Sequence, residues 1–472
     1  MGVKKWSKKS FKDISQYKYL SCTHKYFDLL EQIKKNIPDK FLFVKDNFEI
    51  LSGFAFKSTD YQEKGVKLCR IGDVSKSQLL LIENMEMLPE EFVDRYKEYL
   101  IKKNDVLIGL TGDGKIFKTC YVSELKEPIL LNQRVGILRA INDSFSPKLL
   151  SYVMQSDFVQ NQLRIVGMGK TQKNISPFDV LKVKIPNISF DNQQQILAII
   201  APFESEIASL KATKIPETDI INKVLGKELG LDWEKFEELK KIKQYKANIS
   251  DFSKNVDSRM SYKFHNLAEK YLWDFMISKS DKRLKNFISE PIVLGESVSP
   301  EQYAEEGEFY YIAMSNIKFW NFETDDCRTV KKSYSDKAIK KGKIVKKDDI
   351  ILARSGEGTI GKVALITDGV NAIFADFTQR IRLNNYNPHC AYYYFRSDIF
   401  QYFIYSHKKG MGNNTNIFPN QVQEFPMPDW SLEKQSKIAT LIKEQIDAQK
   451  IIDEQILKKQ QQILQIIENA VR

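Results

Sequence analysis

Two stretches far apart in the chain share one pattern: Lys102–Gly114 reads KKNDVLIGLTGDG and Lys346–Gly358 reads KKDDIILARSGEG, at an offset of 244 residues. Each has a basic pair, a polar turn, a short run of apolar and β-branched residues, and a glycine-rich end. Apolar runs bounded in this way by Asn, Asp and Gly are typical of strands that end in tight turns. The sequence therefore predicts the same strand and turn twice.

Further matches extend this repeat over most of the chain. They follow in the same order at nearly one offset: Tyr61-x3-Gly65 with Tyr303-x3-Gly307, Gln133-Arg134 with Gln379-Arg380, Gly167-Met168-Gly169 with Gly410-Met411-Gly412, and Asn174-Ile175-x-Pro177 with Asn416-Ile417-x-Pro419. Long-range self-similarity at a fixed spacing is the mark of a repeated structural unit. We predict a duplicated, mixed α+β chain with a pseudo-twofold internal repeat.

A long helix is predicted to follow the globular part of each half, because apolar residues recur there in an a/d pattern. The expected seam residues are Ile196, Ile200, Phe203, Ile207 and Leu210 in the first helix, and Ile438, Ile442, Ile452, Ile456, Ile463 and Ile466 in the second. The second helix, Ser431–Val471, would be ~60 Å long, more than one small domain can cover. We expect the two helices to pair as a spacer. The alternative is that each packs on its own domain.

These features give four segments. The first globular domain with its leader takes 1–188, a helical spacer and connector 189–242, the second globular domain with its leader 243–430, and the last helix 431–472. Pro202 lies within the first helix and removes a backbone hydrogen bond, so that helix either kinks or begins after it. We expect Pro216 to end the seam and the connector to break between Gly226 and Gly230.

Composition narrows the function classes. The chain has 472 residues and a formal charge of +11, which favours a polyanionic partner without deciding it. Its five cysteines are scattered without a CxxC, and only four histidines occur, which argues against disulfides, zinc and histidine catalysis and fits a reducing cytoplasm. No apolar run approaches the ~20 residues that a membrane span needs. We expect no membrane association.

The sequence contains no complete catalytic, cofactor-binding or metal-binding motif. Gly109–Lys115 fits the GxxxxGK of a phosphate loop, but Ile116 replaces the required Ser or Thr and a strand-like sequence follows. The pair Asp348–Asp349 would suit a nuclease, yet its counterpart Asn104–Asp105 keeps one carboxylate. We expect that carboxylate to cap the turn before the strand, and we predict that the chain makes or breaks no bonds.

The repeated loops 167–176 (GMGKTQKNIS) and 408–418 (KKGMGNNTNIF) have a composition that suits DNA, because Lys contacts phosphates and amide side chains read base edges. The candidate residues there are Lys170, Gln172, Lys173, Asn174, Lys408, Lys409, Asn413, Asn414 and Asn416. Further candidates flank the strands: Lys57, Arg70, Lys115, Arg354, Thr359 and Lys362. The alternative for the loops is an ordinary surface turn. The Gln-Arg pairs could equally be buried and structural.

The order of these motifs resembles one known family. SGFAFKSTDY (from Ser52), GVKLCRIGDV, KKNDVLIGLTGDGK, LNQRVGILR, GMGKTQKNIS and IPNISFDNQQQI are similar to the specificity subunit of Type I restriction–modification systems. The second half repeats the pattern more loosely, with KKDDIILARSGEGTIGKVALI, TQRIRL and GMGNNTNIF. The departures are Pro202 and the long leaders.

The resemblance implies a non-catalytic, cytoplasmic DNA-binding subunit that serves restriction and DNA methylation. Each globular part would be a target-recognition domain for one half-site, and the helices would form an antiparallel coiled coil that sets the spacing. Two adenine methyltransferase (M) subunits and the restriction (R) subunits would join on double-stranded DNA. S-adenosylmethionine and ATP would belong to them, so this chain needs no cofactor. The alternatives are a DNA-modifying or cleaving enzyme with a degenerate site, and a coiled-coil adaptor that binds only protein.

Overall fold

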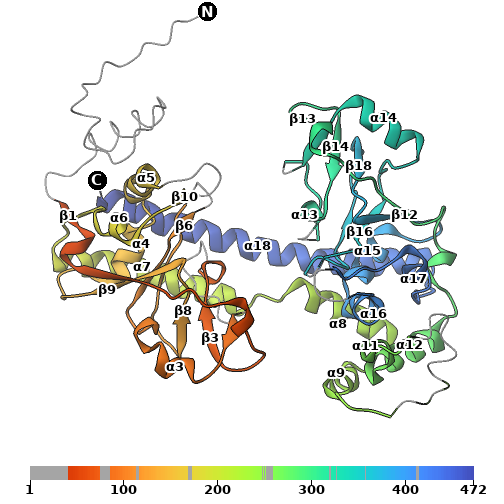
Figure 1. Ribbon diagram of the computed structural model, residues 1–472, viewed down its shortest axis with the longest axis horizontal. Helices are drawn as coiled ribbons and strands as arrows, with labels where there is room; N and C mark the ends of the chain where they lie inside the picture. Colours follow the sequence, from red (N-terminus) through yellow and green to blue (C-terminus); the bar gives the residue numbers. More distant parts are fainter. Residues whose placement is uncertain are drawn as a thin grey trace, which may run out of the picture. The chain divides into compact units, whose positions relative to one another are not determined.

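The computed structural model describes residues 41–471 except 75–84, 113–115, 168–172, 247, 249, 251–258, 318–319, 326, 357 and 411–413. The chain forms two compact units (Figure 1). Unit 1 comprises Met1–Thr213 together with Asp453–Arg472, and unit 2 comprises Lys214–Ile452. The segment boundaries expected at 188/189 and 430/431 separate each globular part from a helix and remain a prediction.

Unit 1 is built on two sheets. The larger is antiparallel in the order β2-β9-β5-β7, with β2 (Phe48–Ser52), β9 (Val135–Ala140), β5 (Val106–Gly109) and β7 (Thr119–Tyr121). The smaller has the order β4-β3-β8, with β4 (Glu86–Leu88), β3 (Val66–Cys69) and β8 (Ile129–Leu131), where β3 and β8 are parallel. Leu107 and Ile137 are fully buried in the core. The β-branched and leucine-rich runs therefore form strands, as predicted.

Shorter elements of unit 1 complete its scaffold. They are β1 (Phe41–Phe43) paired with β11 (Lys184–Pro186), β6 (Thr111–Gly112) paired with β10 (Lys173–Asn174), and helices α3 (Phe92–Arg95), α4 (Pro147–Val153), α5 (Asp157–Val166) and α6 (Pro177–Leu181). The single helix expected around Ser146–Gln162 is in fact two helices. Ser156 separates them because its hydroxyl caps α5, accepting a hydrogen bond from the backbone of Val159.

Unit 2 repeats the sheets. One has the order β12-β19-β16-β17, with β12 (Val293–Leu294), β19 (Thr378–Ile381), β16 (Ile350–Ala353) and β17 (Val363–Leu365). The other has the order β13-β15-β14-β18, with β13 (Tyr303–Ala304), β15 (Arg328–Val330), β14 (Phe309–Ile312) and β18 (Ala372–Phe374). The β14–β18 pair is parallel, like β3–β8. The two units therefore share one sheet plan.

Helices of unit 2 surround these sheets. They are α8 (Glu217–Leu229), α9 (Trp233–Lys241), α11 (Tyr262–His265), α12 (Leu267–Lys279), α13 (Met314–Ile317), α14 (Lys332–Lys340), α15 (Pro388–Arg396), α16 (Asp398–His407) and α17 (Pro419–Val422). The helix expected around His389–Tyr405 is again two, divided by a serine cap at Ser397. The connector breaks at Gly230, which is left-handed at φ 74°, whereas Gly226 lies inside α8. Pro216 caps the start of α8 and follows the end of the first seam.

The turn before the central strand is the same in both units. Asn104 and Asp348 are left-handed, at φ 70° and 72°. The next residue, Asp105 or Asp349, accepts a hydrogen bond at 2.6 Å from the amide three positions before it. The carboxylate that persists in the repeat therefore caps this turn, as predicted.

A buried glutamine near the start of each long helix ties that helix to its own unit. In α7 (Phe190–Ala212), the Oε1 of Gln193 accepts the amide of Ser146 at 2.8 Å. In α18 (Leu432–Val471), the Oε1 of Gln435 accepts the amide of Asn387 at 2.6 Å. Ser146 and Asn387 cap α4 and α15, so the two contacts are equivalent. This correspondence strengthens the case for duplication beyond the sequence matches.

The sequence match of Gln133-Arg134 with Gln379-Arg380 does not pair equivalent positions of the two units. Strand pairing in both units follows an offset of 243, as in Lys67 with Ile129 and Tyr310 with Ala372, so Phe377 is the counterpart of Arg134. Gln133 and Arg134 are exposed. Arg380 is buried, donates to the carbonyl of Gly342 at 2.7 Å and pairs with Glu290. The second pair is therefore structural.

The helix α7 starts at Phe190 and continues through Pro202, so it does not begin after the proline. Within it Ile200 and Ile207 are buried, while Ile196, Phe203 and Leu210 are half-buried. Its buried residues Gln193, Ile200 and Ile207 follow one another at intervals of seven residues. Two of the five predicted seam residues of the first helix are thus buried and three are half-buried, and their role as a coiled-coil seam stays a prediction.

The seam of α18 is divided between the two units. Ile438 and Ile442 lie in the core of unit 2, so they do not pair with α7. Ile456 and Ile463 are buried in the part that belongs to unit 1, and Ile452 is half-buried. Near the end Ile467 is buried and Ile466 is not, because a straight helix drifts away from a strict seven-residue repeat. The first part of α18 thus packs on its own domain, and its last part lies with α7 in unit 1.

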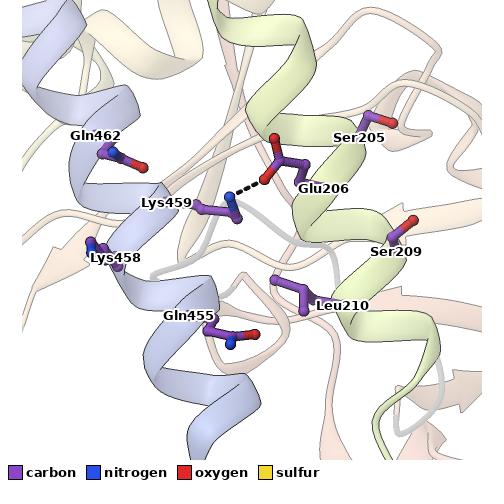
Figure 2. Close-up of a pocket in the computed structure, with 8 residues that line it drawn as sticks. All are labelled: Ser205, Glu206, Ser209, Leu210, Gln455, Lys458, Lys459 and Gln462. Atoms are coloured by element: carbon purple, nitrogen blue, oxygen red, sulfur yellow. Dashed lines mark hydrogen bonds and ion pairs between the residues drawn. The ribbon is translucent and has the colours of Figure 1, made fainter.

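The last part of α18 runs antiparallel to α7 (Figure 2). Lys459 forms an ion pair with Glu206 across the two helices. A groove of about 670 Å³ beside this pair is lined mainly by polar residues such as Ser205, Gln455 and Gln462. The predicted antiparallel pairing is therefore present in unit 1, with a polar stretch alongside its apolar contacts.

Candidate nucleic-acid interface

Arg354 is a candidate side chain for reading DNA that other parts of unit 2 hold in place. It follows β16, and its Nε donates to the carbonyl of Asp376 at 2.9 Å. Its Nη1 lies 3.4 Å from Oδ1 of Asn416, and its guanidinium lies 5.6 Å from the centre of the Phe418 ring. These contacts come from two separate segments, around Asp376 and in the loop 408–418, and hold a half-buried guanidinium in orientation. A fixed guanidinium fork suits bidentate contacts with a base or a phosphate.

The loop that carries Asn416 is closed at its base. Lys409 and Asn416 exchange two backbone hydrogen bonds of 2.7 Å each. Asn414 is exposed, and its carbonyl accepts from the Nδ2 of Asn416 at 3.1 Å. Gly410 has φ 100°, and a Cβ there would lie 2.2 Å from the Asn414 carbonyl oxygen, so glycine is required. The structure brings Arg354, Lys409, Asn414 and Asn416 together, while Asn413 lies outside the described residues.

Three other candidates of unit 2 are engaged elsewhere. The Thr359 hydroxyl lies 3.0 Å from the carbonyl of Ser355 and stabilises its own turn. The ammonium of Lys362 lies 4.0 Å from the ring centre of Trp320, and burial, aided by nearby Arg396, lowers its pKa. Lys408 is half-buried, and its ammonium lies 5.9 Å from the ring centre of Tyr405. These side chains have structural contacts that the sequence did not indicate.

Unit 1 has the same contact between loop and strand. Asn174, in β10, is exposed, and its Oδ1 accepts the hydroxyl of Thr111 at 2.7 Å. Lys173 pairs with Gly112 through its backbone. In unit 2, Asn416 forms the equivalent bridge with Ser355. Three further candidates lie outside the described residues: Lys115, Lys170 and Gln172.

The two remaining candidates of unit 1 lie near the smaller sheet. Arg70 follows β3 and pairs with Glu86 at 3.1 Å and with Asp73 at 3.8 Å, so it joins β3 to β4. Burial raises the pKa of Asp73 despite this arginine. Lys57 is exposed at the start of a short helical turn. The structure gives Arg70 a structural role and leaves Lys57 accessible.

Two residues that sequence reasoning missed belong to the site. Arg259 donates to the carbonyls of His407 at 2.7 Å and Lys408 at 2.6 Å, which holds the base of the second loop. Phe377 is 49% exposed next to Asp376. The contact of Arg259 spans almost 150 residues, and Phe377 was hidden by the misplaced register. No local pattern signals either of them.

The acidic pair at 348–349 does not form an exposed carboxylate site. Only 1% of the Asp349 side chain is exposed, and it makes two 2.7 Å contacts with Arg382. In unit 1, Asp105 holds Arg139 in the same way and raises the pKa of that arginine. In the part of the chain that the structure describes, no three His, Cys, Asp or Glu residues gather as metal ligands would. The glycine motif before Ile116 leads into strand β7 and not a helix, unlike a phosphate loop.

Comparison with known proteins agrees with this arrangement. Residues 36–217 match the family model described as the Type I restriction modification DNA specificity domain. The match covers less than half of the chain and shows what this region is similar to. The match runs from before β1 to the start of α8, so it covers the described globular part of unit 1 and the helix α7. The specificity domain thus includes the Thr111–Asn174 contact.

Individual relatives are more distant. The Type I restriction enzyme MjaVIII specificity subunit of Methanocaldococcus jannaschii is 28% identical over 154 residues, which cover 32% of this chain and 36% of that relative. A solved S subunit from M. genitalium is 14% identical with a TM-score of 0.37, covering 93% of this chain and 97% of that one. The HsdS subunit from Thermoanaerobacter tengcongensis is 13% identical with a TM-score of 0.31, covering 92% and 97%. Likenesses this weak carry no argument about function.

Among the described residues, no helix combines the length and apolar character needed to cross a bilayer.

Proposed function

We propose that this chain is the non-catalytic DNA-specificity subunit of a Type I restriction–modification enzyme and that each unit reads one half of a bipartite target. The observation that supports this most is the repeated contact between loop and strand. Thr111–Asn174 and Ser355–Asn416 occupy the same place on the same scaffold. The neighbouring residue is Leu110 in one unit and Arg354 in the other. One framework with different side chains suits two different half-sites.

Two linked readers explain specificity without catalysis. When one unit is bound, the second contact is intramolecular, so its local concentration is high and the two discriminations multiply. Each good bidentate base contact contributes about 1–3 kcal/mol of discrimination against a wrong base. The paired part of α7 and α18 is a natural ruler for the spacing between half-sites. We therefore assign sequence choice to the loops and spacing to the helices.

The proposed partners are double-stranded DNA, two adenine methyltransferase subunits, and restriction subunits. The internal duplication supports the number two, because a repeated chain offers two equivalent surfaces. S-adenosylmethionine and ATP would be used by those subunits, which work in the cytoplasm. In this account the segments 189–242 and 431–472 serve as spacer and connector between the recognition domains 1–188 and 243–430.

The experiment compares methylation in cells that carry the methyltransferase subunit with and without this gene. Long-read sequencing should map N6-methyladenine to a bipartite motif only when the gene is present. An unchanged methylation map would contradict the proposal. The purified chain alone, given DNA, magnesium and a methyl donor, should show no turnover, and turnover would favour the enzyme alternative. An adaptor that binds only protein predicts no salt-dependent DNA binding by the assembled complex.

A further inference from the structure

One segment of unit 2 is unusually rich in lysine. Residues 331–347 read KKSYSDKAIKKGKIVKK, with eight lysines and one aspartate, a formal charge of +7 in a chain whose total is +11. We call this segment the α14 lysine patch. Such a concentration of one charge is the electrostatic footprint expected of a surface that binds a polyanion.

The patch lies on a firmly attached helix. α14 buries Ser335 and Ala338, and Ala338 packs with Val330 and Ile373 of the sheet β13-β15-β14-β18. Figure 1 shows α14 at one end of unit 2, with α9, α11 and α12 at the other end of that unit. Lys332, Lys337 and Lys340 of this helix are exposed, while Ser335 and Ala338 face the sheet. The lysines are thus presented on a rigid base.

Most of the patch is not neutralised within the protein. Lys341 pairs with Glu296 at 3.1 Å, and Lys343 donates to the carbonyl of Leu294. Burial, together with Arg380 and Lys341, lowers the pKa of Lys343. Within the described ranges, the six others are exposed and lie beyond ion-pair distance of any carboxylate: Lys331, Lys332, Lys337, Lys340, Lys346 and Lys347. Six exposed positive charges therefore face solvent together.

The fold does not require this charge. The equivalent segment of unit 1, residues 89–103, reads PEEFVDRYKEYLIKK and has four acidic and four basic residues. It follows β4 as the patch follows β15, and both lead into the same left-handed turn. Lys331 and Lys332 also lie at the N-terminal end of α14, where positive charge opposes the helix dipole. Stability alone would not favour these lysines.

We infer that the α14 lysine patch is a sequence-independent contact with the phosphate backbone of the duplex that unit 2 binds. This inference rests on the proposed function. Lysine is a flexible point charge, which suits phosphate, whereas base reading favours the planar fork of arginine or amide groups. Unit 2 would thus hold DNA more tightly than unit 1 through contacts that carry no sequence information.

The test uses the full complex with the methyltransferase subunits. In one variant Lys331, Lys332, Lys337 and Lys340 are replaced by glutamine, and affinity for target and non-target duplexes is measured against salt. Each lost phosphate contact lowers the slope of log affinity against log salt by about 0.9, so we expect a slope shallower by about 2–4 on both duplexes. The methylated motif should stay the same.

Two control variants accompany it. Arginine at the same four positions keeps the charge and should keep the salt slope. Glutamine at four exposed lysines of α8, α9 and α12 removes equal charge from unit 2 and should change the slope by less than about 1: Lys223, Lys227, Lys241 and Lys270. Thermal melting of each variant verifies that unit 2 remains folded.

Three results would overturn the inference. The first is an unchanged salt slope in a folded glutamine variant. The second is a loss confined to the target duplex, which would make the patch a base reader. The third is normal DNA binding with failure to recruit the restriction subunits, which would make it a protein-docking surface. A wild-type complex that binds no DNA would instead contradict the proposed function itself.

Discussion

At the scale of single residues, the carboxylates that looked catalytic are the ones that organise the fold. Asp105 and Asp349 each cap a turn through one backbone amide and hold an arginine of a neighbouring strand with both oxygens. A carboxylate that is buried and fully hydrogen-bonded is not available to a metal or a substrate. The same chemistry occurs at the same place in both units, which explains why this residue type persists in the repeat.

The first prediction concerns Asp349. Replacing it with asparagine removes the bidentate carboxylate from the Arg382 guanidinium, which is 19% exposed, and leaves Glu290 at 2.8 Å as its remaining charged partner. We expect unit 2 to lose about 2–4 kcal/mol of unfolding free energy, measured by urea titration. The matched control is Lys437→Ala, which removes the exposed pair with Glu433 and should cost less than about 1 kcal/mol. Equal small losses in both variants would refute the structural role of Asp349.

The second prediction concerns Arg354. Its substitution by alanine should reduce discrimination at one half of the DNA target by about 1–3 kcal/mol and leave the other half unchanged. Arg354→Lys keeps the charge but not the planar fork of the guanidinium. It should therefore reduce base discrimination at the same half-site and preserve the salt dependence of binding. Competition between single-base variants of the target measures both effects. Relaxation at both halves would show that Arg354 supports the fold instead of reading DNA.

The third prediction tests Arg259 as a positioning residue. Arg259→Ala removes the donors to the carbonyls of His407 and Lys408, so the base of the second loop is no longer fixed. We expect discrimination at the half-site affected by Arg354→Ala to fall by about 10–150-fold, in line with about 1.5–3 kcal/mol for a hydrogen bond to a charged group. Methylation at the other half-site should not change. A uniform loss of activity would indicate general destabilisation.

At the scale of elements, the long helices show what a pattern predicts and what it misses. The bounds of α18 differ by one residue from the expected Ser431–Val471, because forty residues with regular apolar spacing leave little room for error. The expected helices at 146–162 and 389–405 each split at a serine, since a single hydroxyl can cap a new helix without disturbing the apolar spacing. Gln193 and Gln435 bind backbone amides almost fifty residues away, which sequence spacing does not reveal.

The sequence indicated the loops of the candidate site but not which of their side chains are accessible. The loops around Asn174 and Asn416 could be found because glycine and amide residues recur there in order. Thr359, Lys362 and Arg70 looked equally suitable, but each is held by neighbours that are distant in sequence or hidden in a turn. Composition identifies a polar loop, whereas only packing decides which of its side chains remain available.

The fourth prediction belongs to α7. Pro202 lies inside this helix, is exposed, and lacks the amide that would complete the helical hydrogen bonds. Pro202→Ala should raise the unfolding free energy of unit 1 by up to about 3 kcal/mol, measured by denaturant titration. The methylated sequence should stay the same. A decrease in stability would show that the proline is needed to shape the helix at that point.

At the scale of the whole molecule, the globular parts are proposed to read DNA bases and the helices to set the spacing between half-sites. Adding seven residues to both α7 and α18 within their paired stretch should lengthen each by about 10 Å. That length corresponds to about three base pairs of duplex. We expect methylated sites with the same half-site bases and a wider gap between them.

The most direct test of the central claim is an exchange of the first recognition domain. Residues 1–188 would be replaced by the corresponding segment of a relative with a different target, and N6-methyladenine would be mapped by long-read sequencing. The duplicated-reader account predicts that one half of the bipartite motif changes and that the other half and the gap remain. A map in which neither half changes, from a chimera that still methylates DNA, would contradict it.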